Sequence, residues 1–286
     1  MPRRCGAPGG APVCSGPRGR HHRLAGGTRG EWPAGSRPAE IRPEGNQGAR
    51  RSSRSQLGRL SRVRDDPFHP DPGFADLYGR IPDAVDLEPW LTLSRSAKPP
   101  VLYLGAGAGR LAVPLVAAGI DLVVVDAHPG MVRRLRKRLP NVEIHESLIE
   151  TLRLERSFDL IIVPSNILDR SELVVAAARH LAPRGRLAFE LTNPHWLEAK
   201  RHSGYKVVRR RDNRAEVEVT YPDGTVQDGE IELIWPEDVE AFLATAGLQL
   251  VRLSGHTEAE LDTSPTFYVV AARALTRTRR LPPRPK

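Results

Sequence analysis

A glycine-alanine loop between two apolar runs is the part of the sequence whose residue types could bind a ligand. The stretch 101–130 reads VLYLGAGAGRLAVPLVAAGIDLVVVDAHPG, in which Gly105, Gly107 and Gly109 stand between a predicted buried strand and a predicted helix. Glycine there lets the backbone turn tightly and lets a ligand approach without meeting a Cβ. Asp126 ends the next predicted strand, where a carboxylate can accept hydrogen bonds from both ribose hydroxyls of an adenosine. Together these features predict a nucleoside site.

Two other interpretations of the loop are weaker. The dinucleotide fingerprint G-x-G-x-x-G needs a glycine at position 110, where this sequence has Arg110. A nicotinamide or flavin oxidoreductase would also more often continue in parallel strands than end in a hairpin. A tight turn that only packs a helix onto a sheet would not require the carboxylate at position 126.

Alternating strands and helices are expected to position this loop. Near-continuous aliphatic runs predict buried strands at 101–104, 121–126, 142–145, 158–164 and 185–191. Helices are predicted between them, and one or two short helices precede them within 71–94. The last two strands, 248–255 and 266–274, are joined too closely for a helical crossover and should pair antiparallel. The prediction is an α/β fold with a doubly wound, mostly parallel seven-stranded sheet ending in an antiparallel hairpin.

An inserted lid is predicted after the fifth strand, over about residues 195–235. Alternating segments within 205–234 surround a Pro-Asp-Gly turn at 222–224, which is typical of antiparallel strands.

The net charge of +9 is unevenly distributed along the chain. Residues 1–64 hold 14 Arg, no Lys and 3 Glu, the last ten residues carry +5, and the middle holds 24 basic against 31 acidic residues. An acidic middle disfavours a duplex-binding domain, which would gather positive charge on a folded face. Residues 1–66 are therefore expected to be a disordered basic tail or a mis-called start, 67–275 the folded domain, and 276–286 a second basic tail.

The remaining composition predicts a cytoplasmic protein. Cys5 and Cys14 both lie in the N-terminal tail, so neither a disulfide framework nor a thiolate metal site is expected in the domain. The histidines show no metal-ligand spacing, and Pro114, Gly119 and Asp121 interrupt the longest apolar run. No membrane partner is expected.

The segments VLYLGAGAGRLAVPLVAAG, VVVDAHPGMVRRLRKRLP, FDLIIVPSNILD, HLAPRGRLAFELTNP and IWPEDVEAFLATAGLQLVRLSG carry a family resemblance. Over roughly residues 72–275 the sequence resembles the class I S-adenosylmethionine-dependent methyltransferases. It is most similar to their small-molecule branch, which begins with a Tyr-bearing helix, here FADLYG. The resemblance implies S-adenosylmethionine as cofactor and methyl transfer to a nitrogen or oxygen of a small molecule.

The resemblance also implies site residues. Those expected to bind the cofactor are Tyr103, Gly105, Gly107, Gly109, Asp126, Ala127, Leu148, Ile149 and Val163. Those expected to face the acceptor are Tyr78, Asn166, Asn193 and Trp196. Two positions depart from the family, because Tyr103 and Leu148 stand where acidic residues are usual.

His195 is the candidate catalytic residue, since an imidazole following the fifth strand could remove a proton from an amine or hydroxyl. A surface loop histidine is the alternative. The run Arg209, Arg210 and Arg211 in the lid could attract an acidic substrate or be a solvated surface.

Three function classes stay open on the sequence. They are a small-molecule methyltransferase, a methyltransferase-fold protein that binds weakly or no longer catalyses, and a nucleic-acid methyltransferase guided by the basic tail. A nucleic-acid partner is the least favoured, because the loop VPSNIL lacks the N-P-P-Y/F signature of base-amino methyltransferases. The sequence leaves a homodimer open.

Overall fold

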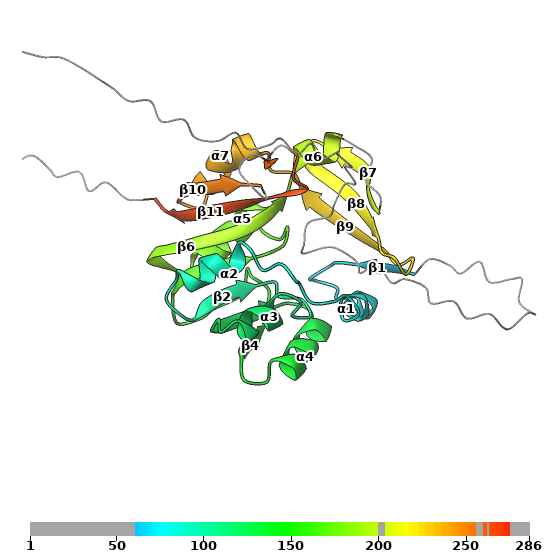
Figure 1. Ribbon diagram of the computed structural model, residues 1–286. Coiled ribbons are helices and arrows are strands. Elements are labelled where there is room, and N and C mark those ends of the chain that lie inside the picture. Colours follow the sequence, from blue (N-terminus) through cyan, green and yellow to red (C-terminus); the bar gives the residue numbers. More distant parts are fainter. Residues whose placement is uncertain (1–60, 200–203, 256–259, 262, 275–286) are drawn as a thin grey trace, which may run out of the picture. The chain divides into compact units, whose positions relative to one another are not determined.

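Two β-sheets make up the described part of the chain, residues 61–199, 204–255, 260–261 and 263–274 of the computed structural model (Figure 1). These residues belong to one compact unit, Trp32–Lys286; a separate unit, Met1–Glu31, lies outside the described residues. The predicted tails, residues 1–66 and 276–286, lie outside them too, except for residues 61–66.

The larger sheet has seven strands in the order β10-β11-β6-β5-β2-β3-β4. The strands are β2 (Val101–Leu104), β3 (Leu122–Asp126), β4 (Glu143–Glu146), β5 (Phe158–Val163), β6 (Leu181–Thr192), β10 (Leu248–Ser254) and β11 (Thr266–Arg273). The strands β4, β3, β2, β5 and β6 are parallel, and β11 pairs antiparallel with both β6 and β10. The predicted fold class is confirmed.

Helices cover both faces of this sheet, which is why its central strands are aliphatic at almost every position. The helices are α1 (Pro72–Tyr78), α2 (Trp90–Arg95), α3 (Ala112–Ala117), α4 (Pro129–Arg138), α5 (Ser171–Ala178), α6 (Pro194–Ala199) and α7 (Val239–Ala244), with a 3₁₀ turn η1 (Pro236–Asp238). Side chains of α5 and α7 pack on the face that contains Leu102 and Phe189. Side chains of α2, α3 and α4 pack on the opposite face, which contains Tyr103 and Ile162.

The second sheet is a roof with the strand order β1-β9-β8-β7. Its strands β7 (Tyr205–Arg211), β8 (Arg214–Thr220) and β9 (Val226–Glu232) pair antiparallel within the predicted lid. The fourth strand, β1 (Arg62–Arg64), pairs parallel with β9. Figure 1 shows β1 between α1 and β9.

The strand β1 extends the fold into a range that the composition assigned to the tail. Its central residue, Val63, is only 5% exposed and packs with Phe74 and Met131. Local composition could not reveal this strand, because it is a three-residue edge that depends on β9 for its hydrogen bonds.

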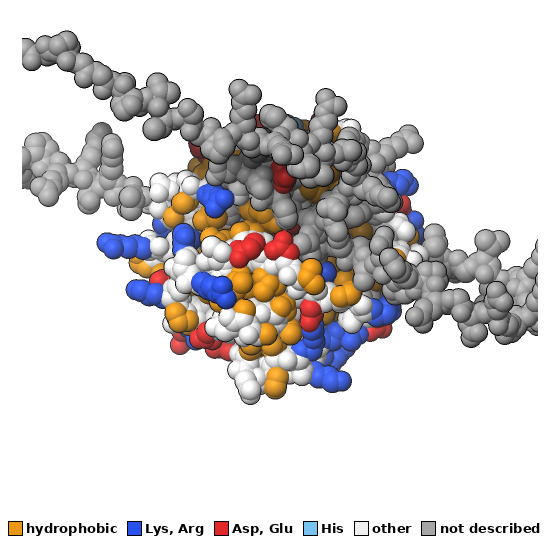
Figure 2. Space-filling view, viewed as in Figure 1, with side chains coloured by type: hydrophobic (Ala, Val, Ile, Leu, Met, Phe, Trp, Pro, Cys, Tyr) orange, Lys and Arg blue, Asp and Glu red, His pale blue; other side chains and the backbone are white. Residues whose placement is uncertain are grey.

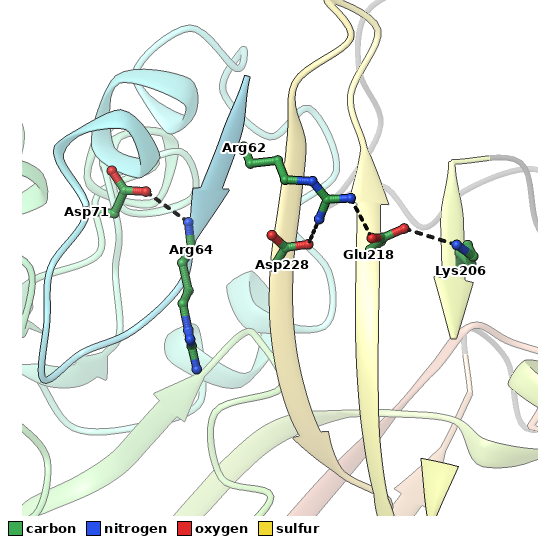
Figure 3. A network of polar contacts seen from close by, with 6 residues as sticks. All are labelled: Arg62, Arg64, Asp71, Lys206, Glu218 and Asp228. Carbon is green, nitrogen blue, oxygen red and sulfur yellow. Dashed lines mark hydrogen bonds and ion pairs between the residues drawn. The ribbon is translucent and has the colours of Figure 1, made fainter. Parts of the chain in front are cut away.

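Ion pairs at the surface hold β1 to the roof (Figure 3). The Arg62 guanidinium lies 2.5 Å from Asp228 and 2.8 Å from Glu218, and Glu218 also pairs with Lys206 at 3.3 Å. On the other side of the strand, the Arg64 backbone N–H donates to the Asp71 carboxylate at 3.0 Å. Exposed pairs of this kind stabilise by about 0–1 kcal/mol each, so their main effect is to orient the strand.

The surface over α4 is basic (Figure 2). Arg133, Arg136 and Lys137 are exposed, while Val132 and Leu135 on the opposite side of α4 are fully buried. Within the described ranges, no helix combines the length and apolar character needed to cross a bilayer.

Candidate active site

A cavity of about 1280 Å³ lies between the carboxyl ends of the central strands and the roof. Its lining comes from the glycine loop, the ends of β3 and β6, the loop after β5, the roof strands, and the segment from β1 through α1. Pockets for drug-sized molecules enclose about 300–1,000 Å³. The cavity therefore has room for a nucleoside and a second small molecule.

The glycine loop presents bare backbone to the cavity mainly at Gly107. Gly105 and Gly107 both line the cavity with positive φ angles of 70° and 57°. A Cβ at Gly107 would have Tyr78 Cδ1 as its nearest neighbour, at 3.8 Å. A Cβ at Gly105 would come within 2.1 Å of Ile167 Cδ1, so that side is filled by the protein.

Gly109 was predicted to bind the cofactor but does not line the cavity. A Cβ there would meet Leu135 Cδ2 at 3.0 Å, so the missing side chain allows α4 to pack against the loop. The expectation of an open backbone from 105 to 109 therefore holds only in part.

Asp126 lies at the cavity wall, and its carboxylate faces the glycine loop. One carboxylate oxygen accepts from the Gly107 N–H at 2.6 Å and the other from the His128 N–H at 2.8 Å. Each oxygen has a second lone pair, so the carboxylate can still accept from two hydroxyl groups. Burial raises the pKa of Asp126, and the two backbone hydrogen bonds oppose that rise.

His128 fixes the start of α4 beside this carboxylate. Its Nδ1 accepts from the Gly130 N–H at 3.0 Å, so the proton of the neutral ring is on Nε2, which lies 2.9 Å from the Asp71 carbonyl oxygen. The imidazole thereby ties α4 to the residue that caps α1.

Tyr103 lines the cavity from β2, but its phenol cannot supply the negative charge that the family usually has there. Burial raises the pKa of Tyr103, and the nearby charges of Asp126 and Glu190 raise it further. The hydroxyl group therefore stays neutral at physiological pH.

Asp65 is a cavity carboxyl that the sequence analysis missed. It follows β1 and lines the cavity, where burial and the charge of Asp126 raise its pKa to about 6. The two carboxyls thus approach the same space from the roof side and the sheet side. No local signal could identify Asp65, because the sequence around it resembles the tail.

Tyr78 covers the glycine loop from α1. Its ring packs on Phe74 with centroids 4.7 Å apart, and its hydroxyl shares a hydrogen bond with Tyr221 from the end of β8. Tyr221 also donates to Gln227 at 2.7 Å. This chain of contacts joins α1 to the roof above Gly107, so Tyr78 lies closer to the predicted cofactor position than to an acceptor position.

The remaining residues predicted to bind the cofactor differ in whether they line the cavity. Ala127, Leu148 and Ile149 line the cavity beyond Asp126 and form an apolar side for it. Val163 is fully buried in the core between β5 and its neighbours and does not line the cavity.

The residues predicted to face the acceptor also differ in whether they line the cavity. Asn166 and Trp196 line the cavity. The Asn166 amide is engaged within the protein, since its oxygen accepts from the Thr192 N–H at 2.7 Å and its nitrogen lies 3.4 Å from Asp169. It therefore positions the loop after β5 against β6.

Asn193 and His195 lie outside the cavity lining. Asn193 is fully buried and donates to the carbonyl oxygens of Leu261 and Ser264 at 2.7 and 2.9 Å. The His195 ring lies 3.1 Å from Glu237 and edge-on to Trp235 with centroids 4.9 Å apart. The geometry supports the surface interpretation of His195.

The arginine run of the lid is engaged at the surface. Arg209 pairs with Glu216 at 3.7 Å, and Arg210 pairs with Glu198 and lies over the Trp235 ring. None of the three arginines lines the cavity, so nothing in their placement supports an acidic substrate.

Glu190 is the second cavity carboxyl that sequence analysis missed. It lies near the carboxyl end of β6, opposite Tyr268 of β11, and lines the cavity. Burial raises its pKa to about 7. The sequence did contain a signal for this residue, since Glu190 is the one charged residue among the otherwise apolar residues LAFEL (187–191) of the predicted strand.

The described residues contain no group of three or more His, Cys, Asp or Glu side chains arranged to hold a metal ion.

Comparisons with known proteins agree with this geometry. A family model described as "Methyltransferase domain" matches residues 101–185, which run from β2 into β6. Three mycobacterial proteins named "uncharacterized methyltransferase", from Mycobacterium bovis and two strains of Mycobacterium tuberculosis, are each 33% identical over 156 residues. The match covers 53% of this chain and 62% of each relative, so it spans less than two thirds of their length.

Solved methyltransferase structures share the fold. The methyltransferase CcbJ from Streptomyces caelestis is 19% identical with a TM-score of 0.53, covering 71% of this chain and 96% of its own. An S-adenosylmethionine-dependent methyltransferase from Clostridium acetobutylicum is 15% identical with a TM-score of 0.55, covering 67% and 93%. The glycopeptide N-methyltransferase MtfA, complexed with sinefungin, is 19% identical with a TM-score of 0.51, covering 68% and 97%.

Residues 101–185 match a methyltransferase domain model, and the order of the seven strands is the fold that the solved methyltransferase structures share.

Proposed function

We propose that this protein transfers a methyl group from S-adenosylmethionine to a nitrogen or oxygen of a small molecule. The observation that carries the proposal is the pairing of Asp126 with the Gly107 backbone at one wall of a large roofed cavity. A carboxylate at this place suits the ribose hydroxyls of an adenosine. The names of the related proteins and structures support the same reaction.

The residues fit the cofactor in three respects. Asp126 would hold the sugar, Gly107 offers backbone that a side chain would otherwise cover, and Ala127, Leu148 and Ile149 give an apolar surface for the base. Asp65 compensates for the missing acid at Tyr103, because it places a carboxyl in the same cavity where the amino-acid end carries an ammonium group.

The chain's own contribution to catalysis is positioning and the exclusion of water. S-adenosylmethionine supplies an electrophilic methyl group on a sulfonium. Tyr78 and Tyr221 close the cavity over the glycine loop, and Asn166 holds the loop after β5 against β6. Holding an acceptor in line beside a reactive group can supply about 7–11 kcal/mol of barrier reduction.

A roofed cavity of this size favours a small molecule over a nucleic acid. The basic surface over α4 also fits a small molecule, because no residue of α4 except Met131 lines the cavity.

Calorimetric titration of the full-length protein with S-adenosylmethionine and S-adenosylhomocysteine tests the proposal. Micromolar dissociation constants are expected for both ligands. No measurable heat at millimolar ligand would contradict an enzyme and leave the inactive binding fold, and affinity for duplex or single-stranded nucleic acid would favour the alternative acceptor.

A further inference from the structure

Glu190 is a cavity carboxyl that the cofactor-binding residues do not use. It lies on the sheet face that carries Tyr103 and Tyr268, in the direction of α2. The strand β5 and its loop separate β6 from the glycine loop in the sheet order. Glu190 is therefore placed in the part of the cavity that a second small molecule would enter.

The surroundings of Glu190 are aromatic and uncharged. The Thr266 hydroxyl donates a hydrogen bond to its carboxylate. Tyr103 and Tyr268 lie close enough for the Glu190 charge to raise their pKa values, and Trp90 meets the Tyr268 ring edge-on with centroids 5.6 Å apart. Aromatic faces beside a carboxylate form an environment that attracts an organic cation.

No positive partner neutralises Glu190 within the described residues. Its pKa responds to burial and to Thr266, and none of the ion pairs that the structure shows there includes it. Glu190 is half-buried, and an unpaired carboxylate in such a place is unfavourable unless a ligand brings the opposite charge.

The whole cavity favours a cationic ligand. Ten carboxyl side chains line it against four arginines. Three of these arginines, Arg64, Arg170 and Arg214, already pair with cavity carboxylates. Such a wall raises the local concentration of cations and disfavours anions.

We propose that Glu190 binds the protonated amine of the methyl acceptor and takes up its proton, so that the acceptor is a primary or secondary amine. The inference rests on the proposed function, because it assigns the acceptor of that same reaction.

The proton and electron balance is complete without another reactant. The N–H bond of the ammonium breaks and the O–H bond of Glu190 forms, which frees the nitrogen lone pair. That pair forms the N–CH₃ bond while the C–S bond breaks, and its electrons stay on sulfur as a neutral thioether. The positive charge passes to the methylated nitrogen, and Glu190 then releases its proton to water.

The acidity of the groups selects nitrogen over oxygen. The pKa of Glu190 is about 7, whereas ordinary amines have pKa values of about 8–10.5. The transfer of a proton from the ammonium group to Glu190 is therefore only slightly unfavourable in free energy. Water has a pKa of about 15.7, and an aliphatic alcohol is a similarly weak acid. A carboxylate is therefore too weak a base to deprotonate an alcohol acceptor.

Binding of matched probes tests the proposal without needing the natural acceptor. The full-length protein, saturated with S-adenosylhomocysteine, is titrated at pH 8 with cyclohexylamine and with cyclohexanol. The amine is expected to bind at least tenfold more tightly. Glu190→Gln, which keeps the shape of the side chain, is expected to abolish that difference.

Glu230→Gln is the matched control, because it removes one carboxyl from the roof strand β9 of the same cavity. It should leave the tenfold preference in place. Three results would each overturn the inference. The amine and the alcohol could bind equally well, or the preference for the amine could survive Glu190→Gln. The amine could also fail to bind at 50-fold the concentration at which the alcohol is tested, a factor that corresponds to roughly 2.3 kcal/mol of binding free energy.

The cofactor-product titration separates this inference from the proposed function. Glu190→Gln should bind S-adenosylhomocysteine as wild type does. If the variant instead loses that binding while folded, Glu190 holds the cofactor's ammonium group and the acceptor assignment is wrong. If wild type itself fails to bind the cofactor product, the proposed function fails first.

Discussion

At the scale of the residue, the proposed chemistry depends on three of the carboxyls that line the cavity. Asp65, Asp126 and Glu190 come from different elements, and burial is the main cause of the raised pKa of each. The cavity lining holds more carboxyls than arginines, so a cation that enters the cavity relieves the repulsion among the carboxylates. A sulfonium cofactor and an ammonium acceptor both meet this condition.

Asp126→Asn should weaken S-adenosylhomocysteine binding by about 10- to 100-fold, because a charge-assisted hydrogen bond contributes about 1.5–3 kcal/mol. Asp121→Asn is the control, since Asp121 is exposed just before the same strand. Calorimetry measures both dissociation constants. Equal affinities in the two variants would remove Asp126 from the site.

Cofactor affinity should fall as the pH decreases through about 6. The Asp65 carboxyl has a pKa of about 6, so below that pH it becomes neutral and loses its attraction for an ammonium group. Asp65→Asn should show the weaker affinity at pH 8 and a flatter profile between pH 5 and 8. A profile identical to that of wild type would show that Asp65 does not contact the ligand.

At the scale of the element, the three-residue strand β1 decides whether Asp65 reaches the cavity. The strand depends on parallel pairing with β9 and on the burial of Val63 against Phe74. The surface ion pairs of Arg62 orient it (Figure 3). Removing the apolar anchor should therefore release the carboxyl that follows.

Val63→Asp should release β1 from the roof and weaken S-adenosylhomocysteine binding about tenfold, because a buried unpaired charge costs several kcal/mol. Val251→Asp is the matched control, since it introduces the same charge at a valine that is 54% exposed, on the strand β10, of which no residue lines the cavity. Hydrogen exchange at residues 62–64 and 226–228 reports the release. Faster exchange in Val63→Asp with unchanged affinity would separate the strand from binding.

For the whole molecule, two sheets share one cavity, and binding should couple to stability. A ligand at 100 times its dissociation constant stabilises the folded state by about 2.7 kcal/mol. The links through Tyr78 with Tyr221, and from Asp169 to the Glu232 N–H at 2.8 Å, connect the larger sheet's side of the cavity to the roof.

Stability should depend on the protonation of Glu190. Its folded pKa of about 7 lies above its ordinary value of 4.5, so the folded state binds the proton more tightly than the unfolded state. This contribution is fully present below pH 4.5 and is lost as the pH rises through 7. Glu190→Gln should remove roughly 2 kcal/mol of that decline.

Urea denaturation at pH 4.5, 6 and 8 measures the effect as a difference between wild type and variant. The difference cancels carboxyls such as Glu143 and Asp223, whose lowered pKa values act in the opposite direction. Parallel curves for the two proteins would show that Glu190 is already ionised when folded.

The sequence was sufficient for the larger sheet, including its strand positions, the antiparallel hairpin and the place of Asp126. These features are local or periodic, because aliphatic runs, glycines and strand-end carboxylates keep their meaning whatever surrounds them. The strand β6 is longer than predicted, since Leu181 pairs with Phe158 across a break in register.

The chemistry in the cavity required the tertiary structure. Asp65 and Glu190 enter one space from segments that lie about 125 positions apart, and His195 turns to Glu237 although it follows the strand where catalytic residues gather. Even at Gly105 the room that the missing side chain leaves is taken by Ile167. Patterns of residue types along the sequence predict local structure. The direction and the neighbours of a side chain depend instead on how the two sheets pack.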